Sequence, residues 1–331
     1  MHRICVLGTG GWGTSLAIHL RNRGCQVNLW GRDRKYVEEL SQTRENIRYL
    51  PGIKIPPEVH LQSDAAEAFD DVELVLEVIP TQYIRPVLKR VRSHYPERVP
   101  MVSGSKGIEN HTLLTGTGII RDVLGEDLPV GVLSGPSHCE EMVRGRPTGV
   151  VVAASDAELS KKVQTIFNGS NFRVYTNSDL VGVELCGAMK NVVAIAAGIC
   201  DGLGYGDNAK AALVTRGLNE MARLGFVLGA KDHTFRGLAG VGDLYTTCAS
   251  PYGRNLSVGE RLGQGEKLDE IRASMGQVAE GVATTRSVVE LAKKHGVELP
   301  ICEAIHKVLF HHKPPAKAVQ ELMSREPGEE E

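Results

Sequence analysis

A glycine-rich hexapeptide near the start of the chain constrains the fold more than any other feature. Residues 8–13 read Gly-Thr-Gly-Gly-Trp-Gly and directly follow an apolar run at residues 4–7. A G-x-G-x-x-G turn between a strand and a helix is typical of dinucleotide binding: Gly8 permits the tight turn, Gly10 lets the backbone approach a pyrophosphate, and Gly13 lets the helix pack closely. An ordinary glycine-rich loop is the alternative, but the apolar stripe after the turn favours a helix there. The chain is therefore predicted to begin with a Rossmann unit whose first helix points its N-terminus at phosphates.

The end of the second predicted strand indicates which dinucleotide the unit accepts. In NAD-binding Rossmann units an acidic residue about 20 positions beyond the glycines holds the ribose hydroxyls. This chain has Gly31 at that place, followed by Arg32, Asp33 and Arg34. The arginines can meet a 2′-phosphate, so we expect NADP(H) as well as NAD(H) to be accepted. The alternative is that both arginines are solvated and Asp33 takes the place of the acid.

Alternating strand and helix patterns predict a doubly wound α/β sheet in the first half of the chain. Further strands are predicted at residues 25–30, 74–79, 99–103, 130–133, 149–153 and 172–175, and helices at 34–41, 64–69, 84–93 and 157–167, with Asp64 and Asp156 as N-caps. After residue 178 only helical patterns follow, such as 179–199, 209–224 and 284–294. We therefore expect a Rossmann domain at residues 1–178, an all-α domain at 179–322 and a disordered acidic tail at 323–331.

Composition limits the class of protein and its partners. The 331 residues carry 38 Lys and Arg against 40 Asp and Glu, so no overall charge favours nucleic acid or an anionic membrane surface. Seven cysteines are scattered without a C-x-x-C pair, which suggests neither a disulfide framework nor a metal cluster. The longest uncharged apolar run, residues 191–200, is too short to span a bilayer. We expect a cytoplasmic enzyme without a metal, a membrane span or a nucleic-acid partner.

A lysine in the helical half is the first candidate for chemistry. Lys190 lies in residues 187–198, a predicted helix that is apolar on nearly every face. Burying its unpaired ammonium is costly, and both burial and a neighbouring cation lower the pKa of a lysine towards neutrality. Lys190 is therefore a candidate general acid or base. The alternative is a lysine whose charged end reaches water at a domain junction.

Three glycine-containing segments supply further polar groups. Lys106 follows the predicted strand at 99–103, and Ser137 with Gly135 follows the next one, at the sheet edge where α/β proteins bind ligands. Residues 237–255 carry Asp243, which can pair with a buried lysine, and Arg254, which can bind a phosphate in a fork. For each segment alone, ordinary loop structure is the alternative.

Together these motifs resemble one family over residues 3–312, the bacterial NAD(P)-dependent glycerol-3-phosphate dehydrogenases. The matching segments are residues 8–13 with Trp12, 105–107, 134–137, 187–191, 206–212, 242–244 and 254–255. The resemblance implies a Rossmann domain followed by an all-α domain of the 6-phosphogluconate dehydrogenase C-terminal type. It also implies reversible reduction of dihydroxyacetone phosphate to sn-glycerol 3-phosphate for glycerophospholipid synthesis, and a homodimer by analogy.

The resemblance also implies roles for single residues. Lys190 matches the catalytic proton donor and acceptor, Lys106 matches a lysine that touches substrate and cofactor, and Asp243 orients both. The remaining substrate positions are Gly135, Ser137, Asn191, Gly253, Arg254 and Asn255. The cofactor positions are Gly8, Gly10, Gly11, Trp12, Gly13, Arg32, Lys106, Cys139, Arg254, Val278 and Glu280. Two residues depart from the family pattern. Cys139 stands where an alanine is expected, and Gly253 stands where many members have a serine or threonine.

Two other classes fit parts of the sequence. A dehydrogenase acting on a 3-hydroxy acid would keep the glycines and a lysine but would not need the Arg254-Asn255 pair. A non-catalytic NADP-binding sensor would keep residues 8–13 but would not need Lys190 in an apolar helix.

Overall fold

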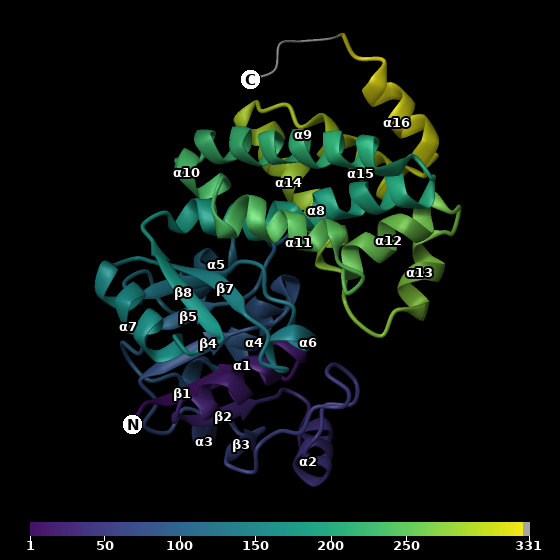
Figure 1. Ribbon diagram of the computed structural model, residues 1–331. Coiled ribbons are helices and arrows are strands. Elements are labelled where there is room, and N and C mark those ends of the chain that lie inside the picture. The colour runs from purple at the N-terminus through teal and green to yellow at the C-terminus, as the bar shows by residue number, and fades with distance from the viewer. Residues whose placement is uncertain (327–331) are drawn as a thin grey trace.

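A twisted sheet with helices on both faces forms the first half of the computed structural model, which describes residues 1–326 (Figure 1). The strands are β1 (Arg3–Leu7), β2 (Gln26–Trp30), β3 (Val59–Gln62), β4 (Leu74–Glu77), β5 (Met101–Ser103), β6 (Val130–Ser134), β7 (Thr148–Ala154) and β8 (Phe172–Asn177). They lie in the order β3-β2-β1-β4-β5-β6-β7-β8. β1 to β6 run parallel, whereas β7 is antiparallel to β6 and parallel to β8. The strand order reverses between β1 and β4, which places a ligand-binding crevice at their carboxyl ends.

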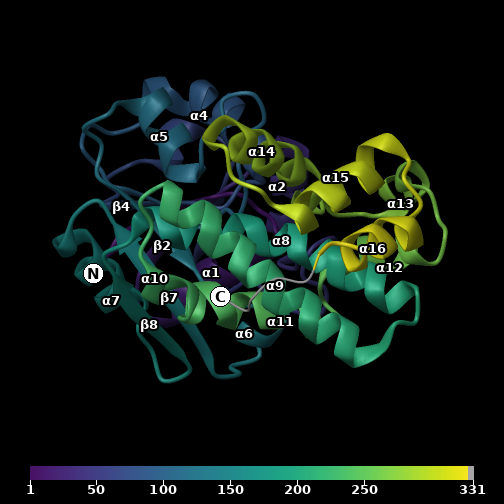
Figure 2. The same cartoon turned by 90° about the horizontal axis from the view of Figure 1, so that it is seen from above.

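Helices cover the two faces of the sheet because successive strand residues point to opposite sides. The helices are α1 (Gly11–Asn22), α2 (Arg34–Thr43), α3 (Ala65–Ala68), α4 (Ile84–Val91), α5 (Gly116–Leu124), α6 (Cys139–Met142) and α7 (Ala157–Phe167), with the 3₁₀ turns η1 (Thr81–Tyr83) and η2 (Arg92–His94). Ile4 and Val6 pack with α1 and α7, whereas Cys5 and Leu7 pack with α4 and α5. Figure 2 shows α4 and α5 on one side of the strands and α1 and α7 on the other.

Within the described residues, only helices follow β8. They are α8 (Leu180–Gly202), α9 (Gly206–Val227), α10 (Asp232–Phe235), the π-helical turn η3 (Leu238–Gly242), α11 (Asp243–Ala249), α12 (Arg254–Gly263), α13 (Leu268–Ser274), α14 (Glu280–His295), α15 (Pro300–His311) and α16 (Pro315–Met323). α8 alone among the described helices is long and apolar enough to cross a membrane, but 89% of its apolar window is buried inside the protein. It is the central helix of the second hydrophobic core.

Glycines bring α8 and α12 into backbone contact. A Cβ atom on Gly198 of α8 would lie 2.0 Å from the carbonyl oxygen of Leu256. In the opposite direction, a Cβ atom on Gly259 of α12 would lie 2.0 Å from the carbonyl oxygen of Ile195. No side chain fits at such distances, so glycine at both positions fixes how closely the two helices cross.

The fold class predicted from the sequence is confirmed, although β3, α5 and the short helix α6 were not predicted. Asp64 and Asp156 are N-caps as predicted, because their carboxylates accept hydrogen bonds from the backbone of α3 and α7. β3 was missed because its sequence Val-His-Leu-Gln has no apolar run, and α5 because Gly116 and Gly118 lower the helix propensity of its first turn. α16 extends to Met323, and residues 327–331 of the predicted tail lie outside the described residues.

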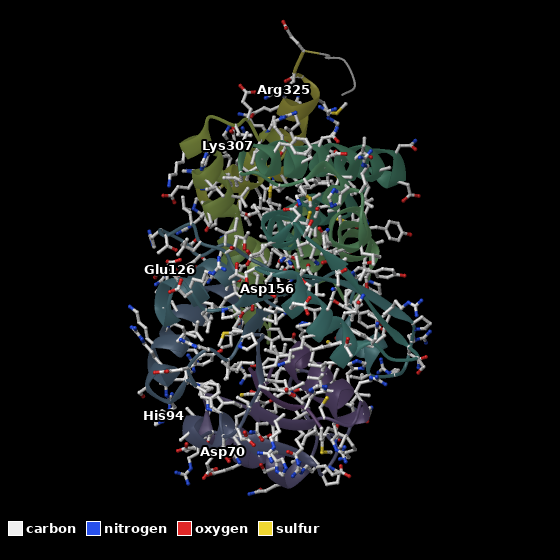
Figure 3. All side chains as sticks on the ribbon, turned by 90° about the vertical axis from the view of Figure 1, so that its left-hand side faces the viewer. Asp70, His94, Glu126, Asp156, Lys307 and Arg325 are labelled. Carbon is white, nitrogen blue, oxygen red and sulfur yellow. The ribbon has the colours of Figure 1, made fainter. Side chains whose placement is uncertain are left out.

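Charged side chains of both signs lie on the outline of the molecule (Figure 3). Asp70, His94 and Glu126 are labelled on the sheet domain, and Lys307 and Arg325 on the helical part. This distribution agrees with the near-equal numbers of acidic and basic residues in the sequence.

Candidate active site

Two lysines and one aspartate from distant parts of the chain meet where the helices cover the sheet edge. Lys190 of α8 places its Nζ 2.9 Å from Oδ1 of Asp243. Lys106, in the turn after β5, donates from its Nζ to Oδ2 of the same carboxylate at 2.7 Å. Lys190 and Asp243 are buried, with relative exposures of 6% and 2%. One carboxylate therefore holds two ammonium groups side by side.

The electrostatics of this cluster favour a lysine that changes protonation state near neutrality. Burial, reinforced by the Lys106 charge and opposed by Asp243, lowers the pKa of Lys190 to about 8. Burial acts to raise the pKa of Asp243, but the two lysines outweigh it and the net shift is downward. Asp243 therefore stays ionised, and Lys190 is able both to give up and to take up a proton near pH 8.

Thr247 is a member of the cluster that sequence reasoning missed. Its hydroxyl donates to the backbone carbonyl of Asp243 at 2.6 Å, which leaves the oxygen to accept a hydrogen bond from Lys190 Nζ. Thr247 lies four residues after Asp243, one turn further along α11. That spacing is the only signal in the sequence that links the two side chains.

Side-chain amides tie the lysine-bearing elements together. Asn191 Nδ2 donates to the backbone carbonyl of Lys106 at 2.9 Å, and Asn255 Nδ2 donates to Asn191 Oδ1 at 2.9 Å. Gly281 N in turn donates to Asn255 Oδ1 at 3.0 Å. Asn191 and Asn255, both predicted to bind substrate, thus link α8 to the Lys106 turn, α12 and α14.

The loop after β6 borders the same cluster. Gly135, at φ 130°, places its carbonyl where it accepts hydrogen bonds from Lys106 Nζ at 3.0 Å and from Ser137 Oγ at 2.8 Å. Next in the loop, Nε2 of His138 is buried without a hydrogen-bond partner in the described residues. Burial and the Lys190 charge lower the pKa of His138, so its imidazole adds little positive charge at neutral pH. Sequence reasoning did not single out His138.

Arg254, Val278 and Glu280 lie at the junction of the two parts of the molecule. Arg254 is exposed at the start of α12 and donates from Nη1 to the Val278 carbonyl at 3.0 Å. Glu280 accepts hydrogen bonds from the Thr81 N–H at 2.7 Å and the Thr81 hydroxyl at 3.0 Å. Glu280 therefore connects α14 to the turn after β4. A Cβ atom on Gly253, the N-cap of α12, would lie 3.0 Å from the Thr247 carbonyl oxygen, which leaves little room for a larger residue.

The glycine-rich turn has the geometry that a pyrophosphate needs. Gly8 adopts φ 126°, and a Cβ atom on Gly13 would lie 1.9 Å from the Gly8 carbonyl oxygen. A Cβ atom on Gly10 would have open space around it, and the first turn of α1 carries neither a side-chain cap nor an acidic residue. The N–H groups at this helix end are therefore available to an anion, and the residues present fit a dinucleotide.

Two other predicted cofactor residues lie at the same end of α1. The Sγ atom of Cys139 lies 3.2 Å from where a Cβ atom on Gly11 would be. In the described residues, Nε1 of Trp12 is buried without a hydrogen-bond partner. These positions surround the helix end that faces the predicted phosphates.

The segment after β2 has one arginine without a local structural role. Asp33 accepts hydrogen bonds from the Lys35 and Tyr36 N–H groups and so caps α2. Arg34 donates to Glu38 at 2.9 Å along the same helix. Arg32, between them and the glycine at residue 31, is exposed.

Comparisons with known proteins agree over nearly the whole chain. Two family profiles match, described as NAD-dependent glycerol-3-phosphate dehydrogenase N-terminus over residues 3–160 and C-terminus over residues 179–320. The glycerol-3-phosphate dehydrogenase [NAD(P)+] of Geobacillus kaustophilus is 50% identical and covers 100% of this chain and 96% of its own length. A glycerol-3-phosphate dehydrogenase [NAD(P)+] of Salinibacter ruber is 49% identical, and the match covers 98% of this chain and 96% of that protein. The crystal structure of glycerol-3-phosphate dehydrogenase from Coxiella burnetii superposes with a TM-score of 0.94 at 39% identity, covering 98% of this chain and 99% of that one.

Proposed function

The chain belongs to the NAD-dependent glycerol-3-phosphate dehydrogenase family, and we propose that it reversibly reduces dihydroxyacetone phosphate to sn-glycerol 3-phosphate with NAD(P)H. The product is the backbone of glycerophospholipids. The observation that carries the proposal is the buried Lys190–Asp243–Lys106 cluster beside a glycine turn that fits a dinucleotide. An exposed arginine, Arg254, begins the helix that crosses α8.

In the proposed mechanism Lys190 handles the proton. Bound NAD(P)H supplies the hydride, and the ketone oxygen gains negative charge as the hydride arrives. The Lys190 ammonium stabilises that oxygen and protonates it, and in the reverse direction neutral Lys190 removes the hydroxyl proton. Asp243 keeps Lys190 and Lys106 in place and compensates their charge.

Arg254 and the neighbouring backbone amides bind the phosphate away from the reacting carbon. Binding energy gained there orients the carbonyl group without itself taking part in the bond changes. Gly8, Gly10, Gly11, Trp12 and Gly13 would hold the pyrophosphate of the cofactor, and Arg32 its 2′-phosphate.

The direct test measures the consumption of NADPH, monitored as a decrease in its absorbance. The substrates compared are dihydroxyacetone phosphate and a panel of unphosphorylated ketones and keto acids. We expect dihydroxyacetone phosphate to be the preferred substrate. Preference for an unphosphorylated keto acid would replace the proposed substrate class by that of a hydroxy-acid dehydrogenase. NADPH binding without turnover of any member of the panel would favour a sensor.

The pH dependence of the two directions is expected to be opposite. The reductive direction needs Lys190 as ammonium, so its kcat should fall as the pH rises through about 8. The oxidative direction needs neutral Lys190, so its kcat should rise over the same range. Measuring kcat at saturating substrate from pH 6 to 10 in both directions checks this, and profiles of the same sign would exclude Lys190 as the group that titrates.

Cofactor preference is expected to depend on Arg32. A 2′-phosphate carries about two negative charges, which an arginine attracts and an acid repels. Arg32→Asp should therefore lower the NADPH/NADH ratio of kcat/KM by about ten- to a hundredfold, and by less at high salt because the site is exposed. The ratio is measured at two ionic strengths, with Arg34→Asp as the matched control. An unchanged ratio in Arg32→Asp would place the contact with the 2′-phosphate elsewhere.

We also propose residue 178 as the domain boundary, a cytoplasmic location and a homodimer. The boundary is supported by the end of β8 at Asn177 and the start of α8 at Leu180.

A reducing compartment suits the seven cysteines, all of which are unpaired thiols. The homodimer rests on the family likeness and is tested by light scattering of the purified full chain.

A further inference from the structure

Glu77, the last residue of β4, is a carboxyl group inside the sheet domain. Its relative exposure is 0%, and its strand neighbours Leu74, Val75 and Leu76 are buried apolar residues. Burial raises the pKa of Glu77 to about 7. Placing a carboxyl group at such a position costs free energy unless its oxygens are hydrogen-bonded. The contacts of its oxygens therefore indicate what the residue does.

The carboxyl of Glu77 joins the turns that follow two neighbouring strands. Oε2 accepts a hydrogen bond from the hydroxyl of Ser103, the last residue of β5, at 2.7 Å. Oε1 accepts from the Ile79 N–H at 2.6 Å and lies 2.9 Å from the hydroxyl of Ser105, which Glu77 shares with the Ile79 carbonyl oxygen at 2.5 Å. The turn at 103–106 is thereby fastened to the turn at 78–81.

Both turns carry groups of the candidate active site. Ser105 directly precedes Lys106, whose Nζ lies 2.7 Å from Asp243. Ile79 lies two residues before Thr81, which donates two hydrogen bonds to Glu280 of α14. From the opposite side, Asn191 holds the Lys106 carbonyl. Lys106 is therefore fixed on one side by α8 and on the other by the turn that Glu77 holds.

We propose that Glu77 is a positioning residue for the reaction, whose carboxyl fixes the 103–106 turn and thereby holds the Lys106 ammonium on Asp243. This inference rests on the proposed function, because that function gives Lys106 its place beside the substrate. Lysine has a long flexible side chain, so the position of its ammonium depends on where its backbone is held. A displacement of about 1 Å in such a group lowers the rate by up to about a hundredfold.

Two substitutions separate the geometry of Glu77 from its charge. Glu77→Val suits a strand but leaves the Ser103 hydroxyl and the Ile79 N–H without their acceptor, and it leaves the Ser105 hydroxyl with the Ile79 carbonyl as its remaining acceptor. We therefore expect kcat/KM for dihydroxyacetone phosphate to fall about tenfold or more. Glu77→Gln keeps an oxygen that can accept from Ile79 and Ser105, so kcat/KM should stay within about threefold of the original. The Kd for NADPH should change little in both.

Glu220 provides the matched control. It is a second buried carboxyl, and it accepts hydrogen bonds from the Ile301 and Cys302 N–H groups at the start of α15. Glu220→Val, the same substitution as at Glu77, should lower the melting temperature and leave kcat/KM within about twofold of the original. A parallel loss of activity in this control would mean that any loss of a buried carboxyl impairs the enzyme, and it would overturn the specific role of Glu77.

The deciding measurement repeats Glu77→Val in a Lys106→Met background. If Glu77 acts through Lys106, the tenfold loss should shrink to less than about twofold when the ammonium is already absent. An equal loss in both backgrounds would overturn the proposal. If Glu77→Val does not fold, Ser103→Ala is taken through the same pair of backgrounds, since within the described residues the Ser103 hydroxyl donates to Glu77 alone. If the unsubstituted enzyme fails to reduce dihydroxyacetone phosphate, the proposed function is wrong. If the enzyme is active but the losses caused by Glu77→Val and Lys106→Met are additive, only the role of Glu77 is overturned.

Discussion

Replacing Lys190 with alanine is expected to lower kcat by about a thousandfold or more and to leave NADPH binding nearly intact. The substitution removes both the proton donor and the charge that stabilises the developing oxyanion. The glycine turn that would hold the pyrophosphate lies on α1, whereas Lys190 lies on α8, so the two functions should separate. Steady-state kcat with dihydroxyacetone phosphate and a fluorescence titration with NADPH measure them independently.

A second lysine checks that the loss is specific. Lys162 of α7 pairs with Glu73 at 3.5 Å, and both side chains are more than one third exposed to solvent. Lys162→Ala should keep kcat within about twofold, because exposed ion pairs contribute little. A Lys190→Ala enzyme that retains more than about a tenth of the original kcat would remove Lys190 from the role of general acid.

Replacing Arg254 with alanine is expected to lower kcat/KM for the phosphorylated substrate by about a hundredfold or more, with little change in the KM for NADPH. A guanidinium that binds a phosphate in a bidentate manner contributes its charge and two directed hydrogen bonds. Losing these interactions costs several kcal/mol of transition-state stabilisation. The effect should be much smaller for an unphosphorylated ketone, which has no group for Arg254 to bind. Comparing kcat/KM for both substrates in both enzymes isolates the phosphate contribution.

Arg261 is the matched control for Arg254 on the same helix. Its guanidinium pairs with Glu266 near the other end of α12. Arg261→Ala should leave kcat/KM for dihydroxyacetone phosphate within about twofold. An Arg254→Ala enzyme that behaves like this control would place the phosphate site elsewhere.

The sequence predicted best those features that depend on a short segment. The strand, turn and helix around Gly8, Gly10 and Gly13 follow from local spacing, and the apolar surroundings of Lys190 follow from the pattern of α8. Burial of Lys190 was thus predictable from one segment of 12 residues, 187–198.

The partners of Lys190 were not predictable from local patterns. Asp243 lies 53 residues after Lys190 in the sequence. No helical or strand periodicity predicts a contact between residues so far apart. The opposite charges and the resemblance to the dehydrogenase family suggested that Asp243 pairs with the lysines. Its distance to each lysine is known only from the folded structure. Thr247 and Glu77 were missed for a related reason, because a threonine in a helix and a glutamate in an apolar strand gain meaning only when their hydrogen-bond partners are known.

The close glycine contact between α8 and α12 holds two residues of the candidate active site at a fixed backbone spacing. Lys190 and Arg254 lie on these two helices, which cannot slide without driving backbone atoms into one another, and the Asn255–Asn191 hydrogen bond holds the same pair. The distance between the backbones of Lys190 and Arg254 is therefore set by the helix crossing. Under the roles proposed for these two residues, we expect a ketone whose phosphate lies one carbon nearer to the carbonyl or farther from it to be reduced less efficiently than dihydroxyacetone phosphate.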